Sequence, residues 1–175
     1  MSLKLIAEQS KASQDGWEMW QVLKAVEEIK PKVIVEIGYD GGGCLLTYAK
    51  AFPEARIIGI DLNGVEVKHR NITTLKYDST IPLNIKKLTD VLGNSLIDFL
   101  FIDGDHRYGP AKKDFENYKD LVRTGGIIGF HDTNNRGISG VEVDLLMKEI
   151  SNTMSYNTAD FRADRMSPGT ALIWV

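Results

Sequence analysis

The sequence predicts an α/β fold in which a mainly parallel, doubly wound sheet carries helices on both faces. Three observations lead to this prediction. Apolar runs alternate with segments of helical periodicity along the chain. The apolar runs are continuous rather than alternating with polar residues, as in strands buried on both faces. No linker, repeat or low-complexity tract interrupts the 175 residues, so we expect one domain over residues 1–175.

The first helix is expected at residues 17–30, because Met19, Val22, Leu23, Val26 and Ile29 recur at helical spacing and Pro31 follows. Five continuous apolar runs predict strands at 33–37, 56–61, 74–78, 97–103 and 127–132. Helices are expected between them, near 44–52, 64–71, 82–92 and 110–123. Pro110 suits the start of the last of these, and Gly125-Gly126 suit the turn after it. The tail predicts a helix at 141–150 and two strands, 155–161 and 170–175, pairing antiparallel at one sheet edge.

A glycine-rich loop follows the first predicted strand. The apolar run ends in Glu36, the loop reads Gly38-Tyr39-Asp40-Gly41-Gly42-Gly43, and a helix-like segment begins at Cys44. Strand, glycine loop and helix open a Rossmann-like βαβ unit that marks a pocket for an adenosine-type cofactor. A tight turn between strand and helix is the alternative. The cofactor-binding candidates are Glu36, Gly38, Tyr39, Asp40, Gly41, Gly43, Asp61, Leu62, Asp78, Ser79 and Asp103.

The charge of this loop discriminates between cofactors. In the dinucleotide motif Gly-x-Gly-x-x-Gly, the second glycine lets the backbone approach a pyrophosphate. Asp40 stands at that position, and Glu36 lies close before it. Two carboxylates repel a pyrophosphate but attract the sulfonium and α-amino groups of S-adenosylmethionine. The loop therefore favours S-adenosylmethionine, and it disfavours a nicotinamide-dependent oxidoreductase on the same scaffold.

An acidic residue closes each of the five strands predicted to be parallel. The carboxyl ends of such strands share one rim, where ligands bind in open α/β sheets. Asp61 is placed to accept hydrogen bonds from both ribose hydroxyls, and Asp78-Ser79 could meet the adenine amino group. Each acid alone could instead be a helix cap or a turn former. The five residues are Glu36, Asp61, Asp78, Asp103 and Asp132.

Two further segments at this rim suggest a metal and a base. Asp103 and Asp132 would lie about 4.8 Å apart if strands four and five are neighbours, close enough to share a cation such as Mg²⁺. His131 is a third candidate ligand, and Asp105 and His106 are the candidate catalytic residues, taking the proton of a bound hydroxyl. The alternative is a turn at residues 103–105 and a hydrogen-bonded histidine at a strand end.

Bulk properties exclude several classes of protein. With 21 basic and 24 acidic residues and a net charge of −3, the chain shows no Lys/Arg block, which disfavours nucleic acid as the main partner. It shows no apolar run of signal-peptide length at the start, and none of about 20 residues later, so we expect no membrane partner and a cytoplasmic protein. Motifs for a serine nucleophile, a phosphate loop and a zinc array are missing, and methyl transfer by direct displacement requires none of them.

Three motifs together resemble the class I S-adenosylmethionine-dependent methyltransferases. They are Glu36-Ile-Gly-x-x-x-Gly-Gly, Ile102-Asp-Gly-Asp-His-x-Tyr108 and Gly125-Gly-Ile-Ile-x-x-His-Asp132. More narrowly, residues 17–150 resemble the methyltransferase-24 family, which is related to macrolide and aminocoumarin sugar O-methyltransferases and to cephalosporin hydroxylase-like proteins. The resemblance implies strand order 3-2-1-4-5-7-6 with one antiparallel edge strand. It also implies cofactor contacts at Glu36, Gly38 and Asp61, magnesium ligands at Asp103 and Asp132, and a base at Asp105.

The chain departs from that pattern at His131, where sugar-modifying relatives carry a second aspartate. An imidazole ligand admits Mn²⁺, Fe²⁺ or Zn²⁺ more readily than an all-carboxylate site. The chain also lacks the long N-terminal lid of larger relatives, so a second copy in a homo-oligomer could complete the pocket. The missing paired-proline motif after strand four favours oxygen as the methyl acceptor. Transfer to a hydroxyl of a small molecule is the first hypothesis, and a catalytically silent S-adenosylmethionine-binding subunit or regulatory module is the alternative.

Overall fold

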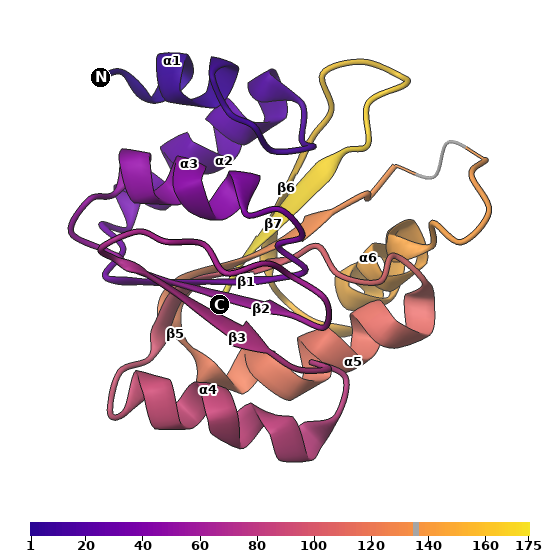
Figure 1. Cartoon of the computed structure of the whole chain (residues 1–175). Coiled ribbons are helices and arrows are strands. Elements are labelled where there is room, and N and C mark those ends of the chain that lie inside the picture. The colour runs from indigo at the N-terminus through magenta and orange to yellow at the C-terminus, as the bar shows by residue number, and fades with distance from the viewer. Residues whose placement is uncertain (135–136) are drawn as a thin grey trace.

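The computed structural model describes residues 1–134 and 137–175. It consists of a seven-stranded sheet with helices on both faces (Figure 1). The order β3-β2-β1-β4-β5-β7-β6 confirms the predicted topology. The first five strands pair in parallel, and β7 runs antiparallel to both β5 and β6, which leaves β6 at the edge. The strands are β1 Val33–Ile37, β2 Arg56–Asp61, β3 Ile72–Lys76, β4 Ile97–Ile102, β5 Val122–His131, β6 Asn157–Phe161 and β7 Thr170–Trp174.

Helices α1 Leu3–Glu8, α2 Gly16–Glu28 and α3 Gly43–Ala51 cover one face of the sheet, and α4 Ile85–Leu92, α5 Tyr108–Tyr118 and α6 Val143–Thr153 cover the other (Figure 1). Successive strand residues alternate between two apolar cores. Ile34 packs with α2 and α3, whereas Val35 packs with α4 and α5. Short 3₁₀ turns, Pro82–Asn84 and Lys119–Leu121, precede α4 and follow α5. Among the described residues, no helix is long and apolar enough to cross a bilayer.

The helix expected at 64–71 is wrong, because this segment is an extended loop that packs against Tyr39. The Tyr39 hydroxyl donates to the carbonyl of Val65 at 3.0 Å, and a Cβ placed on Gly64 would lie 2.5 Å from the tyrosine ring. Asp61 accepts from the amides of Asn63 and Gly64, both at 2.7 Å, which fixes the turn after β2. Tertiary contacts therefore decide the conformation of this segment.

Several boundaries also differ from the prediction. The helix expected at 110–123 ends at Tyr118, and a 3₁₀ turn and the start of β5 follow it. Strand β3 begins and ends two residues earlier than expected, so Asp78 lies in the loop after the strand. Strand β5 begins at Val122, because Gly125 (φ +74°) and Gly126 belong to the strand and not to a turn before it. The pairing of β5 with β4 shifts register between Ile97 and Phe99 of β4. The sequence prediction also contains no counterpart of α1, whose six residues are too few for a clear helical period.

Candidate active site

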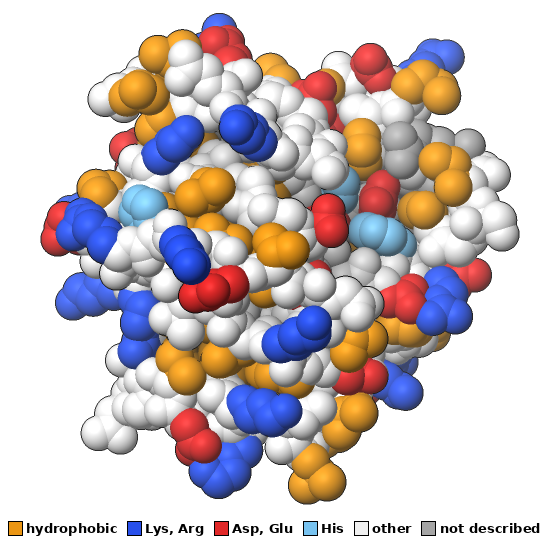
Figure 2. Space-filling model, in the orientation of Figure 1, with side chains coloured by type: hydrophobic (Ala, Val, Ile, Leu, Met, Phe, Trp, Pro, Cys, Tyr) orange, Lys and Arg blue, Asp and Glu red, His pale blue; other side chains and the backbone are white. Residues whose placement is uncertain are grey.

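The rim at the carboxyl ends of β1, β2 and β4 encloses a cavity of about 550 Å³. Backbone hydrogen bonds from Gly38 to Ile60 and from Asp103 to Ile37, both 2.8 Å long, hold these strand ends together. On the face shown in Figure 2, acidic side chains gather beside histidines to the right of centre. The cavity brings together most of the predicted site residues: Gly38, Asp40, Asp61, Leu62, Asp78, Ser79, Asp103, Asp105 and His106.

The remaining loop residues, Glu36, Tyr39, Gly41 and Gly43, line an adjoining cavity of about 150 Å³. The N-terminal segment closes this cavity, since a Cβ on Gly43 would lie 2.5 Å from the carbonyl oxygen of Lys11. Gly38 has φ +84°, and a Cβ there would overlap the backbone of Asp103. Close packing of the protein on itself therefore explains why these two positions carry glycine. Tyr39 is buried, so it packs against the protein interior.

Glu36 is 1% exposed, and its Oε2 has no hydrogen-bond partner among the described residues. Burial, reinforced by the nearby charge of Asp103, raises the pKa of Glu36 well above its ordinary value. Gln14 lines the same cavity as Glu36. The side-chain amide of Gln14 donates to Oδ2 of Asp103, and its carbonyl oxygen accepts from the thiol of Cys44 at 2.6 Å. Sequence reasoning missed Gln14, which lies outside every predicted element. The carboxyl group of Glu36 therefore leaves an unsatisfied hydrogen-bonding site beside the glycine loop, and a cationic ligand group placed there would favour its ionised form.

Asp61 and Asp78 occupy the other side of the larger cavity. Oδ2 of Asp61 accepts from the amide of Asp40 at 3.0 Å, which ties the acid at the end of β2 to the glycine loop. Oδ1 of Asp78 accepts from the amide and hydroxyl of Thr80 at 2.9 and 2.7 Å. Asp78 is therefore a turn former, as the alternative interpretation held, and it still lines the cavity. A carboxylate accepts about four hydrogen bonds, so both residues retain capacity for a ligand.

Asp103, His131 and Asp132 form a compact cluster whose potential ligand atoms all lie within 4.8 Å of one another. Nδ1 of His131 is 3.0 Å from Oδ1 of Asp103 and 3.6 Å from Oδ2 of Asp132. Burial alone would lower the pKa of His131, but Asp103 and Asp132 outweigh it, so the pKa is raised. The Nε2 atom of His131 is buried with no partner among the described residues. Two carboxylates and one imidazole, whose Nε2 has no partner among the described residues, fit a divalent cation.

The two candidate bases differ in their surroundings. Asp105 forms an ion pair with Arg107, whose Nε lies 2.9 and 3.1 Å from the carboxylate oxygens. Hydrogen bonds from Arg107 lower the pKa of Asp105, which makes it a weak base. His106 places Nδ1 3.1 Å from Oδ2 of Asp132, and its side chain is 35% exposed at the cavity. His106 therefore lies against the candidate metal-binding cluster and is still exposed to the cavity.

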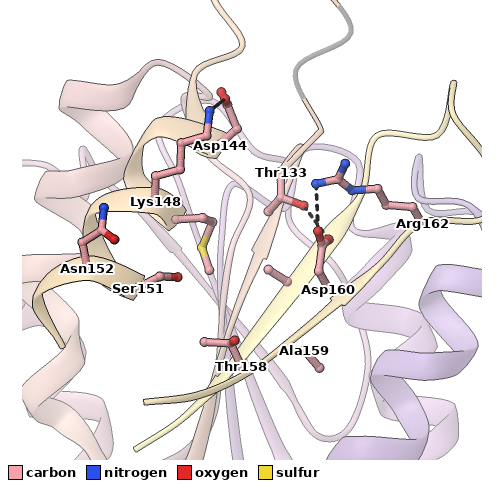
Figure 3. Close-up of a pocket in the computed structure, with 11 residues that line it drawn as sticks. Thr133, Asp144, Lys148, Ser151, Asn152, Thr158, Ala159, Asp160 and Arg162 are labelled. Carbon is pink, nitrogen blue, oxygen red and sulfur yellow. Dashed lines mark hydrogen bonds and ion pairs between the residues drawn. The ribbon is translucent and has the colours of Figure 1, made fainter. Parts of the chain in front are cut away.

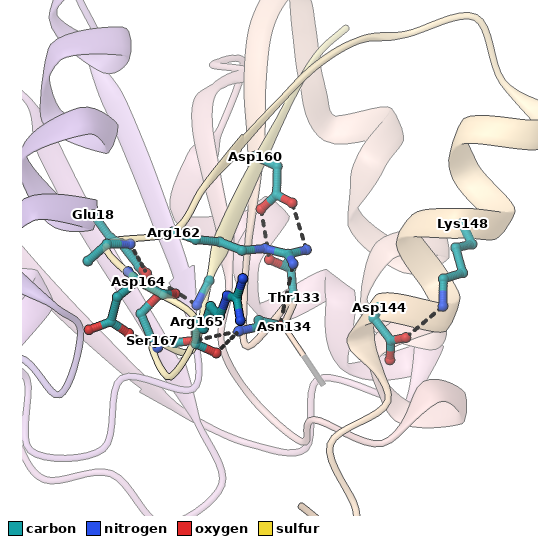
Figure 4. A network of polar contacts seen from close by, with 12 residues as sticks. Glu18, Thr133, Asn134, Asp144, Lys148, Asp160, Arg162, Asp164, Arg165 and Ser167 are labelled. Carbon is teal, nitrogen blue, oxygen red and sulfur yellow. Dashed lines mark hydrogen bonds and ion pairs between the residues drawn. The ribbon is translucent and has the colours of Figure 1, made fainter. Parts of the chain in front are cut away.

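A polar network fixes the chain directly after Asp132, whose backbone has φ +55° (Figure 4). The amide of Thr133 donates to Gly169 at 3.2 Å, and the side chain of Asn134 donates to Ser167 at 2.8 Å. Glu18 of α2, fully buried, accepts from the amides of Ala163 and Gly169 at 3.3 Å. Helix α2 and the β6–β7 loop therefore hold the end of β5 in position.

A third cavity, of about 310 Å³, lies between α6 and β6 at the other edge of the sheet (Figure 3). Its charged side chains are paired with one another: Lys148 with Asp144 at 2.9 Å, and Arg162 with Asp160 at 2.8 Å. Thr133 lines it and donates to Asp160 at 3.4 Å. None of the site residues predicted from the sequence is among the described residues that line this cavity, and the two predicted for catalysis line the cavity of about 550 Å³.

Residues 35–133, more than half of the chain, match the family model of a methyltransferase domain. An uncharacterized protein of Acanthamoeba polyphaga mimivirus is 31% identical over 77% of this chain and 62% of its own length. Caffeoyl-CoA O-methyltransferase of Zinnia elegans is 32% identical over 60% of this chain and 46% of its own. The chain thus spans about half to two thirds of these relatives.

Two solved structures share the fold. MycE methyltransferase of the mycinamycin pathway, in complex with Mg and S-adenosylhomocysteine, has a TM-score of 0.75 at 18% identity, covering 99% of this chain and 54% of its own. An O-methyltransferase from Bacillus cereus, in complex with S-adenosylhomocysteine, has a TM-score of 0.68 at 15% identity, covering 99% and 87%. At these identities the likeness shows the fold alone. With the family match and the motifs at residues 36–43, 102–108 and 125–132, the chain belongs to the methyltransferase-24 family of methyltransferase domains.

Proposed function

We propose that this chain transfers a methyl group from S-adenosylmethionine to a hydroxyl of a small molecule, assisted by a divalent cation. The observation that carries the proposal is the cavity of about 550 Å³, which runs from the acidic glycine loop to Asp103 and His106. A cofactor site and a proton acceptor thus share one cavity, as a direct displacement requires.

The cofactor would lie along this cavity with its positive groups at the glycine loop. Glu36, whose Oε2 lacks a partner among the described residues, and Asp40 complement the sulfonium and the α-amino group. Asp61 is positioned for the ribose hydroxyls, and Asp78 with Ser79 for the base. Bound S-adenosylhomocysteine in MycE and in the Bacillus cereus enzyme supports this choice of cofactor.

Asp103, His131 and Asp132 would hold the cation, and the Mg in the MycE complex supports a metal at this fold. A bound cation lowers the pKa of a coordinated hydroxyl. The mixed nitrogen and oxygen donors suit Mn²⁺, Fe²⁺ or Zn²⁺ as well as Mg²⁺.

His106 is the proposed base, in preference to Asp105. Its contact with Asp132 orients Nδ1–H toward the carboxylate and leaves Nε2 to accept the proton of the acceptor hydroxyl. Asp105 instead holds Arg107, and its lowered pKa disfavours proton uptake. The hydroxyl of Tyr39 donates to the carbonyl of Val65, and the buried thiol of Cys44 donates to Gln14, so neither group is proposed as the base.

A silent S-adenosylmethionine-binding subunit or regulatory module is the competing proposal. Release of S-adenosylhomocysteine from a panel of hydroxylated acceptors, with and without chelator, separates the two. Our proposal predicts turnover that the chelator abolishes and that His106→Gln reduces at least about 100-fold, while Asp105→Asn leaves most of it. Cofactor binding without turnover for any acceptor would favour the silent subunit.

A further inference from the structure

Asp114 is a buried carboxyl that the proposed reaction does not use. It lies on the inner face of α5 and is 1% exposed, yet it lines the cavity of about 550 Å³. Its Oδ1 has no hydrogen-bond partner among the described residues. Its Oδ2 would lie 3.4 Å from a Cβ on Gly104, so the carboxyl points toward the loop after β4 at the rim. A buried polar atom without a partner costs free energy, so a ligand atom is its natural complement.

The surroundings of Asp114 favour its un-ionised form. Burial, opposed by a hydrogen bond with Ser79 and reinforced by the charges of Asp78 and Asp105, raises the pKa of Asp114 to about 7. The phenols of Tyr77 and Tyr118 also face it, and burial raises the pKa of both, so they are neutral at pH 7. An un-ionised carboxyl offers one donor and one acceptor side by side.

We propose that Asp114 recognises the adenine base of the cofactor, donating from its un-ionised carboxyl to a ring nitrogen and accepting from the neighbouring amino group. Adenine presents an acceptor nitrogen next to an amino donor, which is the complement of this carboxyl. Asp78 and Ser79, at the same end of the cavity, are the residues assigned above to the base. The inference rests on the proposed function, because it names the contact that selects the nucleobase.

A purely structural role for Asp114 would be to hold the loop after β3 through Ser79. Asn117, one turn further along α5, already donates to the carbonyl of Ser79 at 3.1 Å. Asn117→Ala therefore serves as the matched control, since it weakens the same loop without removing the carboxyl. A structural role predicts similar effects from both positions, whereas base recognition predicts a proton-linked effect at Asp114 alone.

The test is calorimetric titration with S-adenosylhomocysteine at pH 8 in buffers of different ionisation enthalpy. Because the α-ammonium group of the ligand also changes the protonation of Glu36, the decisive quantity is the difference between wild type and Asp114→Asn in the number of protons taken up on binding. We expect the wild type to take up about 0.5 to 1 proton more, since binding requires the un-ionised acid. The amide introduced by Asp114→Asn preserves one donor and one acceptor, so this variant should bind within about threefold of wild type, and Asp114→Leu at least about tenfold more weakly.

Asn117→Ala should keep the wild-type proton uptake. Equal proton uptake by wild type and Asp114→Asn would overturn the inference while leaving the proposed function in place. Equal affinity of Asp114→Leu and wild type would do the same. A wild type that does not bind S-adenosylhomocysteine at all would refute the proposed function itself, and the inference with it.

Discussion

Gly38→Ala tests whether the glycine loop is fixed by contact with the end of β4. Gly38 has φ +84°, a conformation that costs an L-residue about 1–2 kcal/mol. An added Cβ would also lie 2.5 Å from Cα of Gly104 and would overlap the Asp103 carbonyl, and both are backbone atoms that cannot rotate away. Overpacking of this kind costs about 1–3 kcal/mol. The free energy of unfolding should therefore fall by about 2–5 kcal/mol.

Gly41→Ala is the matched control in the same loop. Apart from its chain neighbours, no described residue has an atom within 4 Å of a Cβ added there, so its free energy of unfolding should stay within about 0.5 kcal/mol of wild type. Urea denaturation measures both variants, and titration with Mn²⁺ reports whether moving Asp103 disturbs the metal cluster. Gly38→Ala should also weaken Mn²⁺ binding. A loss below about 1 kcal/mol for Gly38→Ala, or equal losses for both variants, would refute the reasoning.

Three further predictions concern single side chains. Above about pH 6, Glu36→Gln should have a higher free energy of unfolding than wild type in urea titrations. The pKa of Glu36 is raised in the folded state, so the wild type loses stability as the pH rises above 4.5, the ordinary pKa of a glutamate, and the amide does not. The same variant should weaken S-adenosylhomocysteine binding by about tenfold, and unchanged binding would contradict its proposed role. His131→Ala should abolish stoichiometric Mn²⁺ binding measured by electron paramagnetic resonance, whereas the signal should persist in Asp105→Asn. Glu18→Ala should lower the free energy of unfolding by about 3 kcal/mol, since it removes the acceptor of the buried Gly169 amide and of the partly buried contact with the Ala163 amide. A loss under about 1 kcal/mol would show that water replaces the carboxylate.

The positions of most strands and the acidic rim could be predicted from the sequence because each depends on local signals, whereas the strand order was implied by the resemblance to a known family. Continuous apolar runs define the strands, and an acid after each run falls at the same rim in a parallel sheet. The compact cluster of Asp103, His131 and Asp132 follows directly from the adjacency of β4 and β5. These features required no knowledge of long-range packing beyond strand order.

The remaining features depend on contacts between distant segments. Residues 64–71 have the composition of a helix, but the ring and hydroxyl of Tyr39 hold them extended. Gln14 reaches Asp103 across 89 positions of sequence, and no local pattern marks it. Asp114 did carry a signal, since it shares the buried face of α5 with Ala111, Phe115 and Tyr118, and a polar residue on an apolar helical face is unusual. The pairing of Asp105 with Arg107 required side-chain geometry.

The acidic loop that begins the cofactor cavity is the centre of this account, and calorimetric titration of the wild type with S-adenosylhomocysteine and with NAD⁺ tests it most directly. Asp40, and Glu36 once an α-ammonium group beside it favours its ionised form, predict binding of S-adenosylhomocysteine and no measurable heat from the dinucleotide. Tight binding of NAD⁺ with none of S-adenosylhomocysteine would contradict the account.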